Sequence, residues 1–279
     1  MGKRFSLFAG ATLFAAAMVF DPLRELMDSA KRSDYYSHII LIPLVTGYLI
    51  YSQKKDLLGN PTPSYGAGGL LTLLGMALYA LGFYRLKELN LNDQVALLVL
   101  AAILFWVGGF LLLYGLEAFR RNSFPFLFLL FMIPLPHALM SQIIYALQVA
   151  STEVSEVLYF LSGVPYQREG FVFHLPGISV EVAEVCSGIR SSLALFITSI
   201  LAGHFFLDRL WKKAILAAAV FPVTVFKNGA RILTLSLLGV YVDPKFLTGG
   251  FLHQSGGFLF FIPALGLLGL TLWALRRKG

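Results

Sequence analysis

The chain has 279 residues, of which 57% are hydrophobic and only 13% are charged, and its mean hydropathy is +0.75. These values exclude an ordinary water-soluble domain, in which about 25% of the residues are charged. The formal net charge is +7, but the basic residues lie in short flanks of apolar segments, as membrane-topology signals do. We therefore expect an integral membrane protein that binds no nucleic acid.

Eight apolar segments approach the length of about 20 residues that a bilayer-spanning helix needs. They cover approximately Phe5–Phe20, His38–Tyr51, Tyr65–Tyr84, Gln94–Leu116, Phe124–Val149, Ile189–Leu207, Ala214–Tyr241 and Phe251–Leu275. We predict an all-α polytopic membrane protein with about eight transmembrane helices, forming one integral membrane domain over residues 1–279. The first segment ends at Asp21-Pro22 without a small-residue cleavage site, so we expect no cleavable signal peptide.

Basic residues cluster at alternate ends of these segments. The clusters are Lys3-Arg4, Lys54-Lys55, Arg120-Arg121, Arg209 with Lys212-Lys213, and Arg276-Arg277-Lys278. Cytoplasmic loops of membrane proteins carry an excess of Lys and Arg. We therefore expect a multi-pass protein of the cytoplasmic (inner) membrane with both termini in the cytoplasm. The loops around Asp34, Cys186 and His253 then face the extracytoplasmic side.

Two of the apolar segments contain residues that disfavour a continuous helix. Pro134-Leu135-Pro136 is expected to kink or break the fifth segment, because proline removes backbone hydrogen bonds. Lys227-Asn228-Gly229 is expected to interrupt the seventh in a similar way. A helix that starts at Ala214 on the cytoplasmic side rises about 26 Å by Arg231, which places Arg231 in the outer leaflet.

The longest extracytoplasmic loop, about residues 150–185, has a structure of its own. Thr152–Ser162 has apolar residues at helical spacing and predicts an amphipathic helix that lies at the membrane interface. Phe171–His174 and Ile178–Val182 flank the turn signal Pro176-Gly177, which predicts a short β-hairpin. The hairpin leads directly to Cys186.

Cys186 is the only cysteine, which excludes an internal disulfide and a multi-cysteine metal site. It lies where an alternation of apolar and other residues ends and the apolar segment from Ile189 begins. The N-terminal dipole of that helix favours the thiolate form of a cysteine there. The alternative is a small buried hydrophobic side chain, which the flanking Glu, Ser, Gly and Arg residues disfavour.

Arg231 and His253 share the expected side and depth of Cys186. A thiolate can attack a carbonyl, an imidazole can move its proton, and a guanidinium can stabilise the oxyanion. Asn228 lies three residues before Arg231, on the same helical face. The alternatives are that Arg231 only extends to the membrane interface and that His253 is structural, as the other four histidines are expected to be. Those four are His38, His137, His174 and His204.

Three sequence blocks are similar to the signatures of the exosortase/archaeosortase family. They are Glu184-Val185-Cys186-Ser187-Gly188-Ile189-Arg190, Asn228 to Arg231, and His253 four residues before Gly257. Tyr36-Ser37-His38 with Pro43, Pro134-Leu135-Pro136, and Gly170 through Val182 resemble further landmarks. The resemblance extends from about residue 34 to residue 261.

The resemblance implies a membrane cysteine transpeptidase. Its substrates would be exported proteins with a C-terminal sorting signal: a short motif such as PEP, a transmembrane helix and a basic tail. A membrane lipid or glycan would be the acceptor. Cys186 would be the nucleophile, His253 the general base and acid, and Arg231 the oxyanion stabiliser. Supporting positions would be Asn228, Glu184, Ser187, Gly188 and His38, with no cofactor and no metal.

Three other functions stay open at the level of sequence. A membrane protease of the same chemistry would pass the acyl group to water. A transporter could line an outward cavity with Arg231 and the histidines, and discontinuous helices would suit it. Metal-dependent hydrolysis is the least favoured, because the histidines lack HExxH-type spacing.

Overall fold

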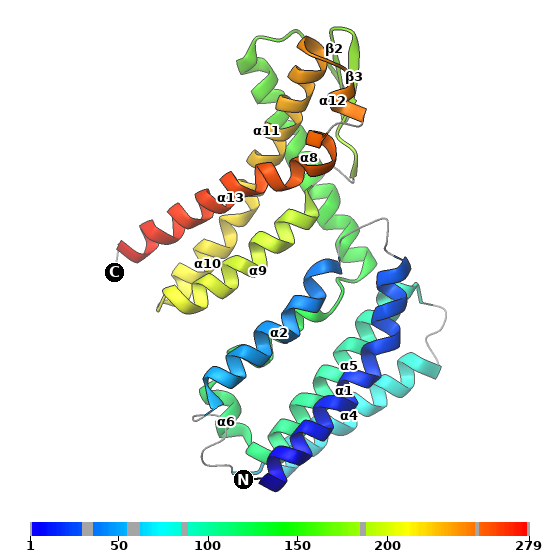
Figure 1. Ribbon diagram of the computed structural model, residues 1–279, viewed down its shortest axis with the longest axis vertical. Helices are drawn as coiled ribbons and strands as arrows, with labels where there is room; N and C mark the ends of the chain where they lie inside the picture. The colour runs from blue at the N-terminus through cyan, green and yellow to red at the C-terminus, as the bar shows by residue number, and fades with distance from the viewer. Residues whose placement is uncertain are drawn as a thin grey trace. The chain divides into compact units, whose positions relative to one another are not determined.

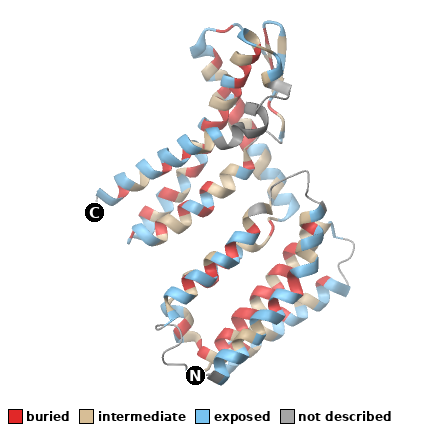
Figure 2. Ribbon diagram, viewed as in Figure 1, coloured by how far each residue is buried: buried red, intermediate tan, exposed pale blue. Residues whose placement is uncertain are grey.

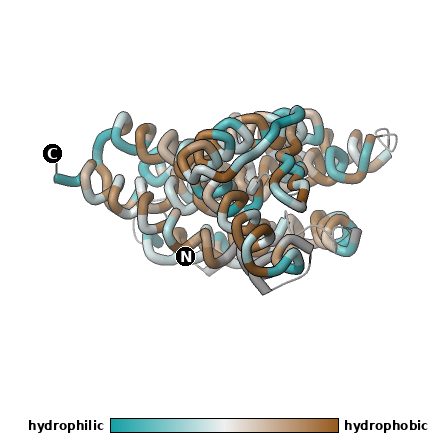
Figure 3. The backbone as a smooth tube through the Cα atoms, turned by 90° about the horizontal axis from the view of Figure 1, so that it is seen from above, coloured by the Kyte–Doolittle hydropathy of each residue, from teal (hydrophilic) through white to brown (hydrophobic). Residues whose placement is uncertain are grey.

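The computed structural model describes residues 2–29, 36–54, 62–84, 89–184, 188–248 and 251–277, and it is predominantly helical (Figure 1). The side chains of residues 251–258 lie outside the description. Six described helices are long and apolar enough to cross a membrane, and a bent helix pair makes seven if it counts as one span. The predicted all-α polytopic class is therefore confirmed, and Figure 3 shows hydrophobic residues, in brown, alternating with more polar ones along the helical backbone.

The helices and strands follow in chain order. They are α1 (Gly2–Ser29), α2 (Ser37–Ser52), α4 (Tyr65–Tyr84), α5 (Leu91–Tyr114), α6 (Leu116–Arg121), α7 (Phe124–Phe128), the 3-10 helix η2 (Leu129–Met132), α8 (His137–Ser162), β1 (Gln167–Glu169), β2 (Val172–Leu175), β3 (Ile178–Glu181), α9 (Ile189–Phe206), α10 (Leu210–Ala218), α11 (Val220–Tyr241), α12 (Lys245–Thr248) and α13 (Phe251–Arg277).

The chain divides into two compact units, Met1–Leu139 and Met140–Gly279. The predicted single domain therefore stays a prediction. In the first unit α5 packs against α1 and α4, and much of α5 is buried (Figure 2). A Cβ at Gly75 of α4 would lie 2.6 Å from the backbone nitrogen of Phe105, so glycine is required for this close helix contact.

The first two predicted spans are present with changed bounds. Helix α1 continues through Pro22 to Ser29, well beyond the predicted end at Phe20. Helix α2 has only 16 residues and is a short apolar helix rather than a full-length span.

The break predicted at Pro134-Leu135-Pro136 is confirmed, because η2 ends at Met132 and α8 begins at His137. Side chains from the start of α5 satisfy the backbone at this break. Asn92 Nδ2 donates to the carbonyl of Leu135 at 2.8 Å. The backbone N–H of His137 donates to Asp93 Oδ1 at 2.7 Å.

The helix predicted over Thr152–Ser162 forms the C-terminal part of α8 rather than a separate element. Its polar residues are divided between two environments: Ser151, Thr152 and Ser155 are fully buried, whereas Glu153 is exposed. Thr152 and Ser155 donate their hydroxyls to the carbonyls four residues earlier, at 2.8 and 2.7 Å, so burial leaves these groups hydrogen-bonded. The interfacial position of this segment stays a prediction.

The predicted hairpin is confirmed as β2 and β3, which pair antiparallel with Leu175 opposite Ile178 around the turn. A third strand, β1, was not predicted and pairs antiparallel with β2 in the order β1-β2-β3. Phe173 of β2 is fully buried against Tyr159 of α8, with ring centroids 4.9 Å apart. The sheet therefore has a hydrophobic anchor on α8.

The interruption predicted at Lys227-Asn228-Gly229 is wrong, because α11 runs unbroken from Val220 to Tyr241. Lys227 and Asn228 are buried with partners on other helices, so neither side chain competes for the backbone of α11. Helix α10 instead ends at Ala218, and α11 begins at Val220.

Candidate active site

The first turn of α9 is fixed by hydrogen bonds to one carbonyl group. Gly188 precedes the helix with φ 78°, a left-handed conformation that favours glycine. The hydroxyls of Ser191 and Ser192 both donate to the Gly188 carbonyl at 2.9 Å. Cys186 and Ser187, which come directly before this glycine, lie outside the described residues.

Gly188 lies against two polar side chains of α11. A Cβ at this position would be 3.4 Å from Lys227 Nζ and 3.5 Å from Asn228 Oδ1. The Lys227 ammonium donates a hydrogen bond to Ser191 Oγ, in the first turn of α9. The residue that follows the Cys186-Ser187 pair is therefore held beside the polar face of α11.

Asn228 connects α11 to α8. Its Nδ2 donates to Ser151 Oγ at 3.1 Å, and both residues are buried. The next residue, Gly229, packs directly on α8, where an added Cβ would lie 2.8 Å from Val154 Cγ1. The small residue lets the two helices approach closely enough for the Asn228–Ser151 hydrogen bond.

Arg231 lies on the same side of α11, three residues after Asn228 and four after Lys227. It is half-buried. Lys227 and Asn228 therefore lie beside the start of α9, and Arg231 lies within about one turn of both on α11. Arg231 and Asn228 are the two α11 positions that sequence analysis selected.

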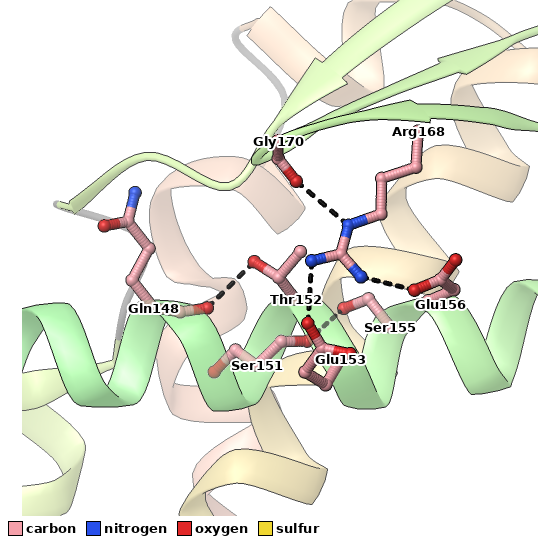
Figure 4. Close-up of polar contacts among 8 residues, drawn as sticks. All are labelled: Gln148, Ser151, Thr152, Glu153, Ser155, Glu156, Arg168 and Gly170. Carbon is pink, nitrogen blue, oxygen red and sulfur yellow. Dashed lines mark hydrogen bonds and ion pairs between the residues drawn. The ribbon is translucent and has the colours of Figure 1, made fainter.

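The β-sheet that precedes Cys186 is attached to α8 by polar contacts at two places. Gln148 Nε2 donates to the Val182 carbonyl at 2.7 Å, directly after β3. Arg168 of β1 reaches α8, where it pairs with Glu153 at 2.7 Å and with Glu156, and its Nε donates to the Gly170 carbonyl (Figure 4). The hydrogen bond to Glu153 is the main cause of a raised pKa of Arg168.

His253 is the third residue of α13, and its side chain lies outside the description. The helix that carries it packs against both α9 and α11, which also contact each other. A buried hydrophobic cluster joins these helices and α10: Leu195, Leu207, Leu216, Val220, Ala264, Leu268 and Leu275. Helix α9 begins after Cys186, α11 carries Arg231 and α13 carries His253. These three helices are therefore mutual neighbours.

Two supporting positions are described at other places. Glu184 is exposed and lies between the Val182 contact and Cys186. His38 is half-buried in α2, which belongs to the first unit, so its relation to the α9–α11 contact stays a prediction. Among the described residues there is no group of three or more His, Cys, Asp or Glu side chains that could hold a metal ion.

The role of Lys227 and Ser191 in joining α11 to α9 was not predicted from the sequence. The signal was present, because a lysine within an apolar helical segment normally has a partner or faces an aqueous cavity. Its partner could not be inferred, since Ser191 lies 36 residues earlier in the chain. Gln148 and Ser151 were missed because they lie on either side of Val149, where the fifth apolar segment was predicted to end.

These features define a multi-pass helical membrane protein whose candidate site lies where α9 meets α11. The chain belongs to the transmembrane exosortase family, whose model matches residues 30–270. This is a family of cysteine transpeptidases, so membership supports an enzyme with a transpeptidase or protease type of role in the membrane. No curated protein and no solved structure matches the chain.

Proposed function

We propose that the protein is a cysteine transpeptidase of the cytoplasmic membrane that cleaves C-terminal sorting signals of exported proteins on the extracytoplasmic side. The observation that carries this proposal is the contact of Gly188 with Lys227 and Asn228. Gly188 follows Cys186 by two residues, and Asn228 precedes Arg231 by three. The contact therefore brings together two of the three sequence blocks that are similar to family signatures.

In the proposed reaction, the Cys186 thiolate attacks the carbonyl carbon of the scissile peptide bond and forms a tetrahedral oxyanion. The oxyanion collapses to a thioester as the C–N bond breaks, and the leaving amine takes a proton from the His253 imidazolium. His253 had received that proton from the Cys186 thiol. An acceptor nucleophile then gives its proton to His253, attacks the thioester and releases the thiolate.

Arg231 is assigned to the oxyanion in this scheme. A guanidinium stays charged at every accessible pH and offers two parallel N–H donors to an oxygen. Loss of one oxyanion donor typically costs about 10²–10³ in rate. Arg231→Lys keeps the charge but loses the planar donor pair, so it should lose activity of about this order if the guanidinium geometry is used.

The family assignment, together with the expected membrane-embedded site, supports a proposal for the substrate class. We infer that substrates carry a short C-terminal motif, a transmembrane helix and a basic tail, and that an envelope lipid or glycan is the acceptor. A water molecule in the acceptor's place would make the same enzyme a hydrolytic protease. The products distinguish these outcomes, because transfer leaves the substrate attached to the acceptor.

The experiment is co-expression with an exported protein that carries such a C-terminal signal. Wild type should convert the substrate to a shorter form, and Cys186→Ala should leave it intact at equal membrane abundance. His204→Ala is a suitable control, since this histidine lies near the opposite end of α9 from the candidate site. Full processing by Cys186→Ala would contradict the proposal and favour a transporter or another hydrolytic mechanism.

A further inference from the structure

Lys227 is a buried cation that the proposed reaction does not use. Only 7% of its surface is exposed, and it lies eight residues into the apolar helix α11. A charged side chain within a membrane helix costs about 2.5–3.5 kcal/mol on insertion scales. Arg231 lies one turn further on, and like charges at this spacing destabilise a helix. A lysine at this position therefore requires a specific compensating contact.

The compensating contact is a hydrogen-bonded chain that ends at the start of α9. Lys227 donates to Ser191 Oγ, and Ser191 Oγ donates to the Gly188 carbonyl at 2.9 Å. A serine hydroxyl can accept one hydrogen bond and donate another at the same time. The ammonium also lies beside Gly188 itself, 3.4 Å from the position of an added Cβ. Both contacts hold the same backbone segment.

We propose that Lys227 is a positioning residue, which acts through Ser191 to hold Gly188, two residues after Cys186, against the face of α11 that carries Arg231. This inference rests on the proposed function, because it assigns a role toward the same nucleophile. Cys186 is two residues from Gly188, so their Cα atoms are at most about 7.6 Å apart. In this proposal, a shift of Gly188 changes the placement of the nucleophile relative to Arg231.

Two neighbouring serines provide a matched test. Ser191 and Ser192 are both half-buried, and each donates to the Gly188 carbonyl at 2.9 Å. Only Ser191 also accepts the hydrogen bond from Lys227. Ser191→Ala and Ser192→Ala therefore remove the same bond to the helix start, but only the first separates Lys227 from α9. Ser191→Thr keeps the hydroxyl and serves as the conservative variant.

The measurement is substrate cleavage by full-length protein in membranes, with kcat and KM determined separately, for wild type, these three variants and Lys227→Met. A displacement of about 1 Å at a reacting group can cost about 100-fold in rate. We expect kcat to fall about 10- to 100-fold in Lys227→Met and Ser191→Ala with little change in KM. Ser192→Ala should stay within about threefold of wild type, and Ser191→Thr should recover most of the rate.

The double variant Lys227→Met with Ser191→Ala measures the energetic coupling between the two residues. If the two residues act through one contact, the double variant should be no slower than Lys227→Met alone. Effects that simply multiply would contradict the proposal. If Lys227→Met fails to accumulate in the membrane, the comparison of Ser191→Ala with Ser192→Ala still decides the question.

The result that would overturn the inference is an equal loss of kcat in Ser191→Ala and Ser192→Ala, or full activity in Lys227→Met. The Cys186→Ala variant distinguishes failure of the positioning role from failure of the proposed function. When Cys186→Ala is inactive and the two serine variants are equal, only the positioning role is lost. When Cys186→Ala cleaves as wild type does, the proposed function fails and the positioning role fails with it.

Discussion

Gly188 combines a left-handed backbone with a position at the start of α9, beside Lys227 and Asn228. An L-residue in this conformation costs about 1–2 kcal/mol, and an added methyl group would contact both α11 side chains. We expect Gly188→Ala to lower the stability of the protein by this amount. We also expect substrate cleavage to fall about tenfold or more, because relief of the strain moves the adjacent Cys186 segment.

Gly163→Ala is the matched control for this prediction. Gly163 also has a positive φ, 71°, but nothing lies within 4 Å of an added Cβ. Thermal unfolding in detergent should show a similar loss of stability in both variants, while cleavage should fall only in Gly188→Ala. An equal loss of cleavage in the two variants would show that Gly188 contributes only to stability.

At the level of single residues, the sequence was informative where residue type alone limits the chemistry. Cys186 is the only thiol, and Arg231 is a guanidinium within an apolar segment, so both could be selected without a structure. Lys227 was interpreted instead as part of a helix interruption. Its partner Ser191 lies on another helix, and only tertiary packing determines that the two meet.

The contact between α8 and α11 includes buried hydrogen bonds between side chains. Asn228 donates to Ser151 beside the candidate site, whereas Tyr159 Oη donates to Ser236 Oγ at 2.6 Å further along the helices. Loss of either bond should cost about 1 kcal/mol of stability or somewhat more if a buried group loses its partner. Asn228→Ala should also reduce cleavage, because Asn228 lies against Gly188.

Tyr159→Phe is the control for Asn228→Ala, since it removes a hydrogen bond from the same pair of helices without touching the α9 start. Unfolding temperature and cleavage rate are the two measurements. Reduced cleavage in Asn228→Ala alone supports a local role at the site. Equal reductions in both variants would mean that the α8–α11 contact as a whole, rather than Asn228, limits activity.

Local sequence signals predicted the ends of elements well where proline and glycine mark a turn or a break. Pro176-Gly177 located the β2–β3 turn, and Pro134-Leu135-Pro136 located the break before α8. Strand β1 was missed because Gln167–Glu169 is polar and has no apolar alternation. The continuity of α11 was missed because a local signal was overridden by tertiary contacts. Lys227, Asn228 and Gly229 disfavour an isolated helix, but their contacts with α8 and α9 stabilise the helix in the folded protein.

The number of membrane crossings determines the topology of the whole molecule. In the described parts of the chain, six long helices, one bent pair and the short helix α2 make eight crossings only if the last two both span the bilayer. Helix α2 has 16 residues and is about 24 Å long, less than the hydrocarbon thickness of about 30 Å. Its crossing requires local thinning of the bilayer or a similar adaptation.

Reporter fusions test this topology directly. Fusions after Lys55, Arg121 and Lys213 should report the cytoplasm, because basic residues cluster at these ends. Fusions near Arg168 and Lys245 should report the extracytoplasmic side. An extracytoplasmic signal after Lys55 would show that α2 does not cross. A cytoplasmic signal at Arg168 would place the β-sheet and Cys186 on the wrong side for exported substrates.

The central claim is that Cys186 forms a covalent thioester with the substrate, and capture of that intermediate tests it most directly. Full-length protein and a tagged substrate are quenched in acid, purified under denaturing conditions and treated with hydroxylamine, which cleaves thioesters. We predict a hydroxylamine-sensitive adduct in wild type and none in Cys186→Ala. His253→Ala should form the adduct slowly and resolve it poorly, because the same imidazole serves both steps. Absence of an adduct in wild type and His253→Ala, together with normal cleavage by Cys186→Ala, would contradict the account.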